Sequence, residues 1–193
     1  MRAPLRPRPD EHTDQPSDEL REVALRAGRG DAAALTELVR ATSTTVWRAC
    51  AALVDPASAD DLAQDTYLRA VTSLPTYRGE ANPTRWLLTI ARRVCAEEIG
   101  ARQRSRRLLA ALESQRRVVS ADFGFVSDVG DAVDRLPDER REAFLLTVVA
   151  GLPYADAAAM CGCPVGTIRS RVARARAELV DVLAEREVQN AAG

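Results

Sequence analysis

Arginine is the residue type through which this chain could do chemistry. The sequence of 193 residues contains 27 basic side chains, all of them arginine, and 28 acidic ones. A guanidinium group offers a planar fork of donors that suits phosphates and the edges of guanine bases. The one histidine, His12, lies in a stretch rich in proline and arginine, which argues against a histidine base or a histidine-containing zinc site. No nucleophile–base pair, metal cluster or glycine-rich phosphate loop is visible, so we expect neither an enzyme nor a cofactor.

The charges are unevenly distributed, although the net charge is only −1. Residues 85–117 hold 9 arginines and 3 acids, and residues 166–177 hold 4 arginines and no acid. The other stretches are acidic, with 13 acids and 7 arginines over residues 10–80 and 8 acids and 3 arginines over residues 118–165. Two basic islands on an acidic background indicate two separate contacts with nucleic acid, and a solvated helix face is the alternative for each.

The four cysteines favour a reducing compartment. Cys50 and Cys95 occupy apolar positions of helical patterns and are predicted to be buried thiols. Cys161 and Cys163 are too few ligands for structural zinc, so a small apolar role at a turn is favoured over a metal or redox role. The N-terminus has no apolar stretch, and the longest apolar run, 144–152, is too short to cross a membrane. We therefore expect a cytoplasmic protein with reduced thiols and no membrane partner.

Helical periodicity predicts an all-α protein of two small domains. Aromatic residues make up 4% of the chain, and apolar residues recur at intervals of three and four. The expected organisation is a disordered tail over 1–17, a four-helix domain over 18–104, a flexible linker over 105–128, a helix-turn-helix domain over 129–187 and a C-terminal tail over 188–193. The expected helices begin near Ser17, Asp31, Asp60, Pro83, Asp131 and Val165, with a short helix over 154–161 before the last one. The helical region that begins near Asp131 is interrupted at Leu136 and Pro137 and resumes over 138–150.

The second basic island has the pattern of a recognition helix. Ala158 suits a close approach of two helices, and Gly162 suits the sharp turn between them. At 3.6 residues per turn, one narrow arc of the last helix holds Ile168, Val172, Ala175 and Leu179, which we expect to face the core. Outside this arc lie Thr167, Arg169, Ser170, Ala173 and Arg174, which are free to meet the major groove. Arg171 and Arg176 are better placed for phosphates or for acids of the chain itself.

Three stretches resemble one known family. They are SADDLAQDTYLRA at 58–70, TRWLLTIARR at 84–93, and the C-terminal set of LPDERR at 136–141, GLPYADAA at 151–158 and PVGTIRSR at 164–171. In this order and spacing, over about residues 20–186, the chain resembles the extracytoplasmic-function sigma factors, and within them the sigma factor C type of mycobacteria and actinomycetes. The family's subunits confer promoter specificity on RNA polymerase. Arg93, Glu97 and Gly100 depart from the usual Asn, Asp and Arg of the family.

The resemblance implies a division of labour between the two domains. The helix 60–74 would dock on the clamp helices of the largest polymerase subunit through Asp61, Gln64, Asp65 and Arg69. The −10 element would be held by Tyr77, Arg78, Asn82, Arg85, Arg92 and Arg93, with Trp86 expected in the core. The −35 element would be read by Thr167, Arg169, Ser170, Arg171 and Arg174. The expected partners are core RNA polymerase, including the flap of its second-largest subunit, and promoter DNA; an anti-sigma protein as a further partner is left open.

A stand-alone helix-turn-helix repressor or activator is the alternative hypothesis. Its first domain would bind an effector or dimerise, and the purified protein would bind duplex operator at nanomolar concentration. This hypothesis explains the second basic island. It leaves the first basic island and the acidic helix 60–74 without a role.

Overall fold

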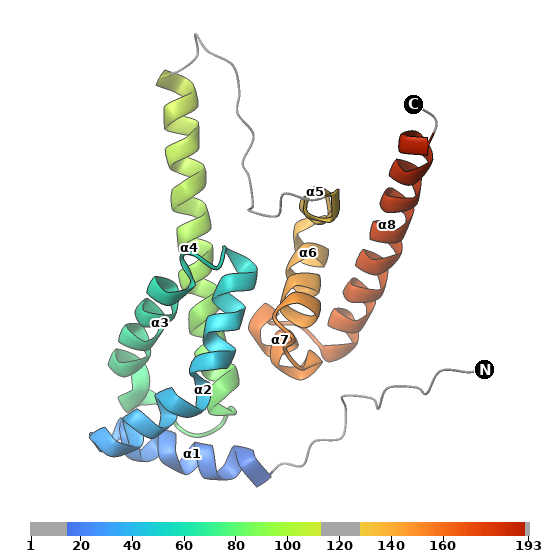
Figure 1. The fold of residues 1–193 in the computed structure, drawn as a ribbon. Coiled ribbons are helices and arrows are strands. Elements are labelled where there is room, and N and C mark those ends of the chain that lie inside the picture. The colour runs from blue at the N-terminus through green and yellow to red at the C-terminus, as the bar shows by residue number, and fades with distance from the viewer. Residues whose placement is uncertain (1–14, 113–127, 192–193) are drawn as a thin grey trace, which may run out of the picture.

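The computed structural model describes residues 15–112 and 128–191, and every regular element in these ranges is helical (Figure 1). The elements are α1 (Gln15–Gly28), α2 (Ala32–Leu53), α3 (Ala59–Ser73), the 3₁₀ turn η1 (Leu74–Thr76), α4 (Pro83–Leu112), α5 (Asp128–Asp134), α6 (Asp138–Phe144), the π-helical turn η2 (Leu145–Val149), α7 (Tyr154–Cys161) and α8 (Val165–Ala191). We call α1–α4 the first unit and α5–α8 the second unit. The predicted all-α fold is confirmed.

The first unit is a four-helix bundle whose start signals lie in the sequence. Asp31 caps α2, because its Oδ1 accepts a hydrogen bond of 3.0 Å from the backbone N–H of Ala34. α1 approaches η1 so closely that a Cβ on Gly28 would lie 2.7 Å from the carbonyl oxygen of Leu74. The core of the bundle includes the buried residues Leu38, Val46, Leu62, Leu87, Leu88, Ala91 and Val94. Cys50 and Cys95 are buried free thiols within it, as predicted.

The second unit is built around the predicted helix-turn-helix. α7 spans the predicted residues, Ala158 is buried, and α8 begins at Val165. α6 passes directly into the π-helical turn η2, where the sequence predicts one continuous α-helix to residue 150. Single π turns occur often at functional sites. Here η2 places the buried side chain of Leu146 toward α2 and its neighbours.

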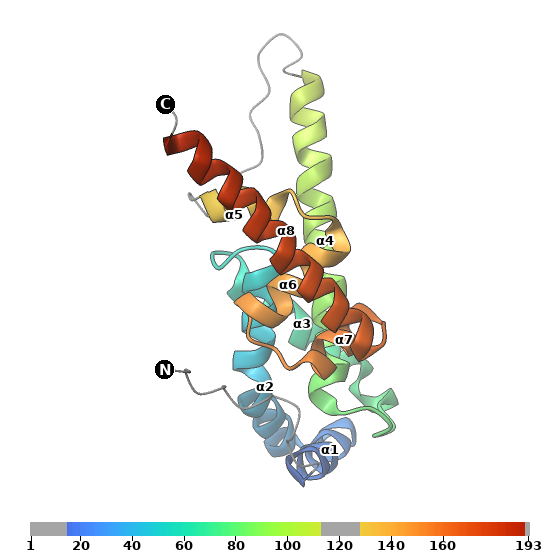
Figure 2. The same cartoon turned by 90° about the vertical axis from the view of Figure 1, so that its right-hand side faces the viewer.

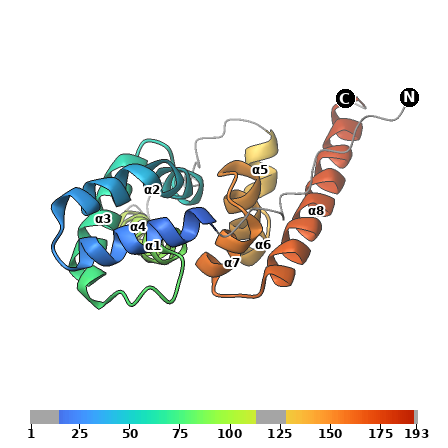
Figure 3. The ribbon, with the colours of Figure 1, turned by 90° about the horizontal axis from the view of Figure 1, so that it is seen from below.

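The two units pack against each other. Seen from below, they stand side by side, with α6 and α7 on the side that faces the first unit (Figure 3). α7 contacts α4, η2 contacts α2, and one buried apolar cluster continues from Leu87 and Leu88 of α4 into Leu146 and Met160. A smaller cluster of Ala132, Leu136, Ala175 and Leu179 belongs to the second unit alone.

α4 extends into the segment predicted as a linker, for which the sequence also allows some helix around residues 107–113. The helix continues without a break to Leu112 and projects beyond α2 and α3 (Figures 1 and 2). Arginine, leucine and alanine dominate its last two turns, and all three are strong helix formers. The rest of the predicted linker up to residue 127, the first 14 residues and the last two lie outside the described residues.

Candidate nucleic-acid and polymerase interfaces

The recognition helix α8 divides its faces as its periodicity predicts. Ile168, Val172, Ala175 and Leu179 are all buried. Arg169, Ser170, Ala173 and Arg174 are exposed, and Thr167 is half-buried. The turn before the helix depends on Gly162, whose φ of 65° lies in the left-handed region. The backbone N–H of Cys163 then bonds to the carbonyl oxygen of Ala158 at 3.1 Å, which fixes the angle between α7 and α8.

Arg171 differs from its neighbours on α8 because its guanidinium is engaged inside the second unit. It forms an ion pair with Glu139 of α6, and its Nη1 lies 3.6 Å from Sγ of Cys163. This geometry agrees with the expectation that Arg171 meets an acid of the chain itself. Burial raises the pKa of the nearby Cys161 thiol to about 12, and the Glu142 carboxylate adds to the shift, so this thiol is neutral at ordinary pH.

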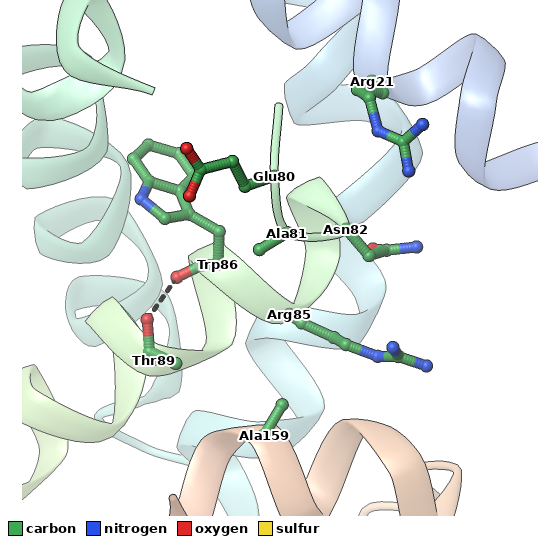
Figure 4. A pocket seen from close by; sticks show the side chains of 8 residues that line it. All are labelled: Arg21, Glu80, Ala81, Asn82, Arg85, Trp86, Thr89 and Ala159. Atoms are coloured by element: carbon green, nitrogen blue, oxygen red, sulfur yellow. Dashed lines mark hydrogen bonds between the residues drawn. The ribbon is translucent and has the colours of Figure 1, made fainter. Parts of the chain in front are cut away.

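Three of the residues predicted to hold the −10 element, Tyr77, Asn82 and Arg85, gather at the start of α4. A cavity of about 360 Å³ opens there, lined by Asn82, Arg85, Trp86 and Thr89, with Arg21 of α1 and Ala159 of α7 on its other sides (Figure 4). The ring of Tyr77 stands 5.2 Å from that of Trp86, and its hydroxyl donates to the carbonyl oxygen of Ala81. Asn82 also caps the start of α4, because its Oδ1 accepts a hydrogen bond of 2.9 Å from the backbone N–H of Thr84. Trp86, expected in the core, is only partly buried and lines this cavity.

Two of the predicted −10 arginines are held by the second unit. Arg85 Nε donates to Oδ1 of Asp156 at 2.9 Å. Arg92 donates two hydrogen bonds to the Glu142 carboxylate, one of 2.6 Å from Nε and one of 3.2 Å from Nη2. Bidentate arginine–carboxylate pairs are among the stronger polar contacts in proteins. We call this packing of the second unit on the first the closed arrangement. It covers part of the surface that the sequence assigns to DNA, whereas Arg78 and Arg93 stay exposed.

The outer face of α3 combines acids with apolar side chains. Asp61 and Gln64 are exposed, and Arg69 binds Asp65 at 2.9 Å and Glu97 of α4 at 2.8 Å. Sequence reasoning missed two members of this face, Leu68 and Val71, whose exposures are 62% and 46%. Their spacing from Asp61 and Gln64, seven residues in both cases, places them on the same side of the helix. That spacing is the signal that could have identified them.

Comparison with known proteins decides the family. The family described as Sigma-70 region 2 matches residues 38–105, and Sigma-70, region 4 matches residues 127–179. The ECF RNA polymerase sigma factor SigC of Mycobacterium tuberculosis (strain CDC 1551 / Oshkosh) is 44% identical over 163 residues, which are 82% of this chain and 88% of that protein. The chain belongs to the extracytoplasmic-function sigma factors. Sigma factors bind core RNA polymerase and direct it to promoter DNA, and this is the function of the chain, not that of a stand-alone repressor.

Two further matches agree with this sigma factor family. The factor EcfG of Rhodopseudomonas palustris (strain TIE-1) is 38% identical over 130 residues, or 65% of this chain and 71% of that protein. CnrH, solved in complex with the cytosolic domain of CnrY, shares the fold with a TM-score of 0.63, at 24% identity over 86% of this chain and 97% of CnrH. Within the described ranges of this sigma factor, none of the helices has the length and apolar character needed to cross a membrane.

Proposed function

We propose that the sigma factor divides its task between the two units. Residues 18–104 bind core polymerase and the −10 element, residues 129–187 read the −35 element, and residues 105–128 connect them. The observation that carries this division is the cavity at the start of α4. The side chains of Asn82 and Arg85 extend to one side of it, where Arg21 also lies, and the ring of Trp86 lies on the other side beside Glu80 (Figure 4). Guanidinium and amide groups can meet phosphates and base edges, and an indole ring offers a stacking surface for an extruded base.

The proposed −10 interface uses the first half of α4 and the loop before it. Tyr77 and Trp86 offer aromatic surface on which an unstacked base can lie. Asn82 lines the cavity and can meet polar base edges, while Arg78, Arg85, Arg92 and Arg93 neutralise phosphates of the non-template strand.

The proposed −35 interface is the exposed face of α8. Arg169 and Arg174 would pair with base edges in the major groove, with Thr167 and Ser170 beside them. Arg171, which is paired with Glu139, would orient this face and contact a phosphate. The second unit also carries the proposed contact with the flap of the second-largest polymerase subunit.

The proposed polymerase contact is the outer face of α3. Asp61, Gln64 and Asp65 present acids and an amide toward the clamp helices of the largest subunit, and Arg69 holds Asp65 in place. Leu68 supplies apolar area beside these polar groups, which is the composition that protein interfaces favour at their centre. This face lies outside the contact between the two units, so polymerase can bind it while the units are closed.

Engagement of the −10 element requires the units to separate. Arg85 and Arg92 are paired with Asp156 and Glu142, and Ala159 stands at the cavity. Promoter phosphates would replace these carboxylates as the partners of the two arginines. The contact is made within one chain, so no anti-sigma protein is needed to account for the closed arrangement. We place this activity in the cytoplasm, alongside polymerase and chromosome, and assign it to binding alone, without a catalytic step.

Run-off transcription with purified core polymerase tests the assignment. On a promoter that depends on its −35 element, R169A/R174A should lose activity equivalent to about 1–3 kcal/mol for each base contact removed. The matched control is R40A/R48A, which removes two exposed arginines on α2, remote in sequence from either DNA-binding segment. Transcription by R169A/R174A at the wild-type level, or an equal loss in R40A/R48A, would contradict the −35 assignment.

A further inference from the structure

The second half of α4 carries arginines to which neither the −10 nor the −35 interface gives a role. Arg104 and Arg107 are exposed and lie on the part of the helix that projects beyond α2 and α3 (Figures 1 and 2). Within residues 15–112 and 128–191, no ion pair is found for either of them or for Arg93. Three unneutralised cations on one rigid helix indicate a site for an anionic partner.

These arginines share one face of α4. At 3.6 residues per turn, Arg93, Gly100, Arg104 and Arg107 fall within an arc of about 60° and extend over about 21 Å of the helix axis. The side chain at position 100 is only a hydrogen atom, and Arg104 folds back over it, with Nη1 3.2 Å from where a Cβ would lie. We call Arg93, Arg104 and Arg107 the α4 stripe.

The acids around the α4 stripe are already paired elsewhere. Glu97, which flanks it, binds Arg69 at 2.8 Å. Asp55 and Glu98 bind Arg102 at 2.5 Å and 2.6 Å on the side that faces the bundle. Three carboxylates of the second unit reach α4: Asp156 and Glu142 pair with Arg85 and Arg92, and Asp138, which lines a cavity together with Gly100, pairs with Arg141. Among the described residues, the α4 stripe therefore keeps its charge available in the closed arrangement.

We propose that the α4 stripe binds the phosphate backbone of duplex DNA, independently of sequence, while the two units are still closed. The inference rests on the proposed function for Arg93 alone and extends it to Arg104 and Arg107. A straight, rigid row of guanidinium groups suits the regular phosphates of a duplex, which carries one charge per about 1.7 Å of its axis. The consequence is that the closed sigma factor associates with chromosomal DNA before any base is read.

The salt dependence of binding tests this proposal. The full chain alone is titrated onto a fluorescent 30-base-pair duplex without promoter sequence, by anisotropy at several NaCl concentrations. The slope of log Kobs against log salt should become shallower by about 1.8 in R104Q/R107Q, because each lost phosphate contact accounts for about 0.9. The matched control is R40Q/R48Q, which removes two exposed arginines of α2 and changes the net charge equally. The control should keep the wild-type slope.

Two results would overturn the proposal. Equal changes of slope in the two double variants would show that net charge, and not the α4 stripe, sets the binding. A loss of affinity for a single-stranded RNA of equal length, with the duplex slope unchanged, would assign the stripe to RNA. Run-off transcription with core polymerase separates this proposal from the proposed function. If the wild-type chain does not support transcription, the promoter assignment is contradicted. The difference in salt slope between wild type and R104Q/R107Q does not depend on that result.

Discussion

Breaking the polar contacts between the two units should open the sigma factor. The double variant D156N/E142Q leaves the shapes of both side chains but removes the charges that hold Arg85 and Arg92. The Arg92 pair is bidentate, with side-chain exposures of 42% and 22%, so solvent screens it and it contributes about 1 kcal/mol. The Arg85 pair has one bond and similar exposure, and it contributes about 0.5 kcal/mol.

A change of about 1.5 kcal/mol shifts the equilibrium between closed and open chains roughly tenfold. While the open form is a minor population, the apparent affinity for a single-stranded oligonucleotide of the non-template −10 sequence should rise by the same factor. Small-angle scattering should show a larger radius of gyration at the same time.

The control for this experiment must carry the same charge change. E139Q/E178Q removes two carboxylates that pair with Arg171 and Arg140, within the second unit. It should leave both the oligonucleotide affinity and the radius of gyration near their wild-type values. An affinity gain that is equal in the two double variants would mean that reduced repulsion of DNA, and not opening, causes it. No gain in either would refute the claim that these pairs hold the closed state.

Three further expectations concern single positions. G162A should lower the free energy of unfolding by about 1 kcal/mol, because the backbone φ of 65° at this position is unfavourable for an L residue. G166A is the control, since Gly166 is helical and a Cβ there meets open space. Thermal melts of the two variants compare them directly. L68A should weaken the affinity for core polymerase several-fold. The melting temperature should not change, because the Leu68 side chain is 62% exposed, and a drop in it would place this side chain in the core instead. Arg102 lowers the pKa of Asp55 in the folded chain, so this carboxylate adds stability above its unfolded pKa of about 3.9 and loses it as pH falls toward and through the lower folded value. The difference in melting temperature between wild type and D55N should therefore be constant at pH 5 and above and begin to narrow as pH falls below about 4.

The sequence predicts those features that depend on residues close to one another along the chain. The buried arc of α8, the left-handed turn at Gly162 and the cap at Asp31 depend on residues within one or two helical turns, and all three are found in the structure. The pairs of Arg85 with Asp156 and of Arg92 with Glu142 join residues 71 and 50 positions apart. No periodicity connects such partners, because their meeting depends on how two finished units pack. The sequence therefore proposes residues for two DNA interfaces, which stay predictions, and could not predict that the second unit covers part of the −10 surface.

The apolar part of this contact determines what can open it. Promoter phosphates can replace Asp156 and Glu142 as partners of the arginines, but they cannot cover the apolar side chains that the same contact buries. Leu146 and Met160 of the second unit belong to the same buried cluster as Leu87 and Leu88 of α4. Exposing such side chains to water costs about 25 cal/mol for each Å² of apolar surface. DNA alone is therefore poorly suited to separate the two units. A protein surface that covers them offsets this cost, and a ligand shifts an equilibrium only by its difference in affinity for the two states. Core polymerase should therefore bind first, through α3, which is accessible in both states. Its surface should then cover the apolar side chains that separation of the units exposes, and the −10 strand should enter afterwards.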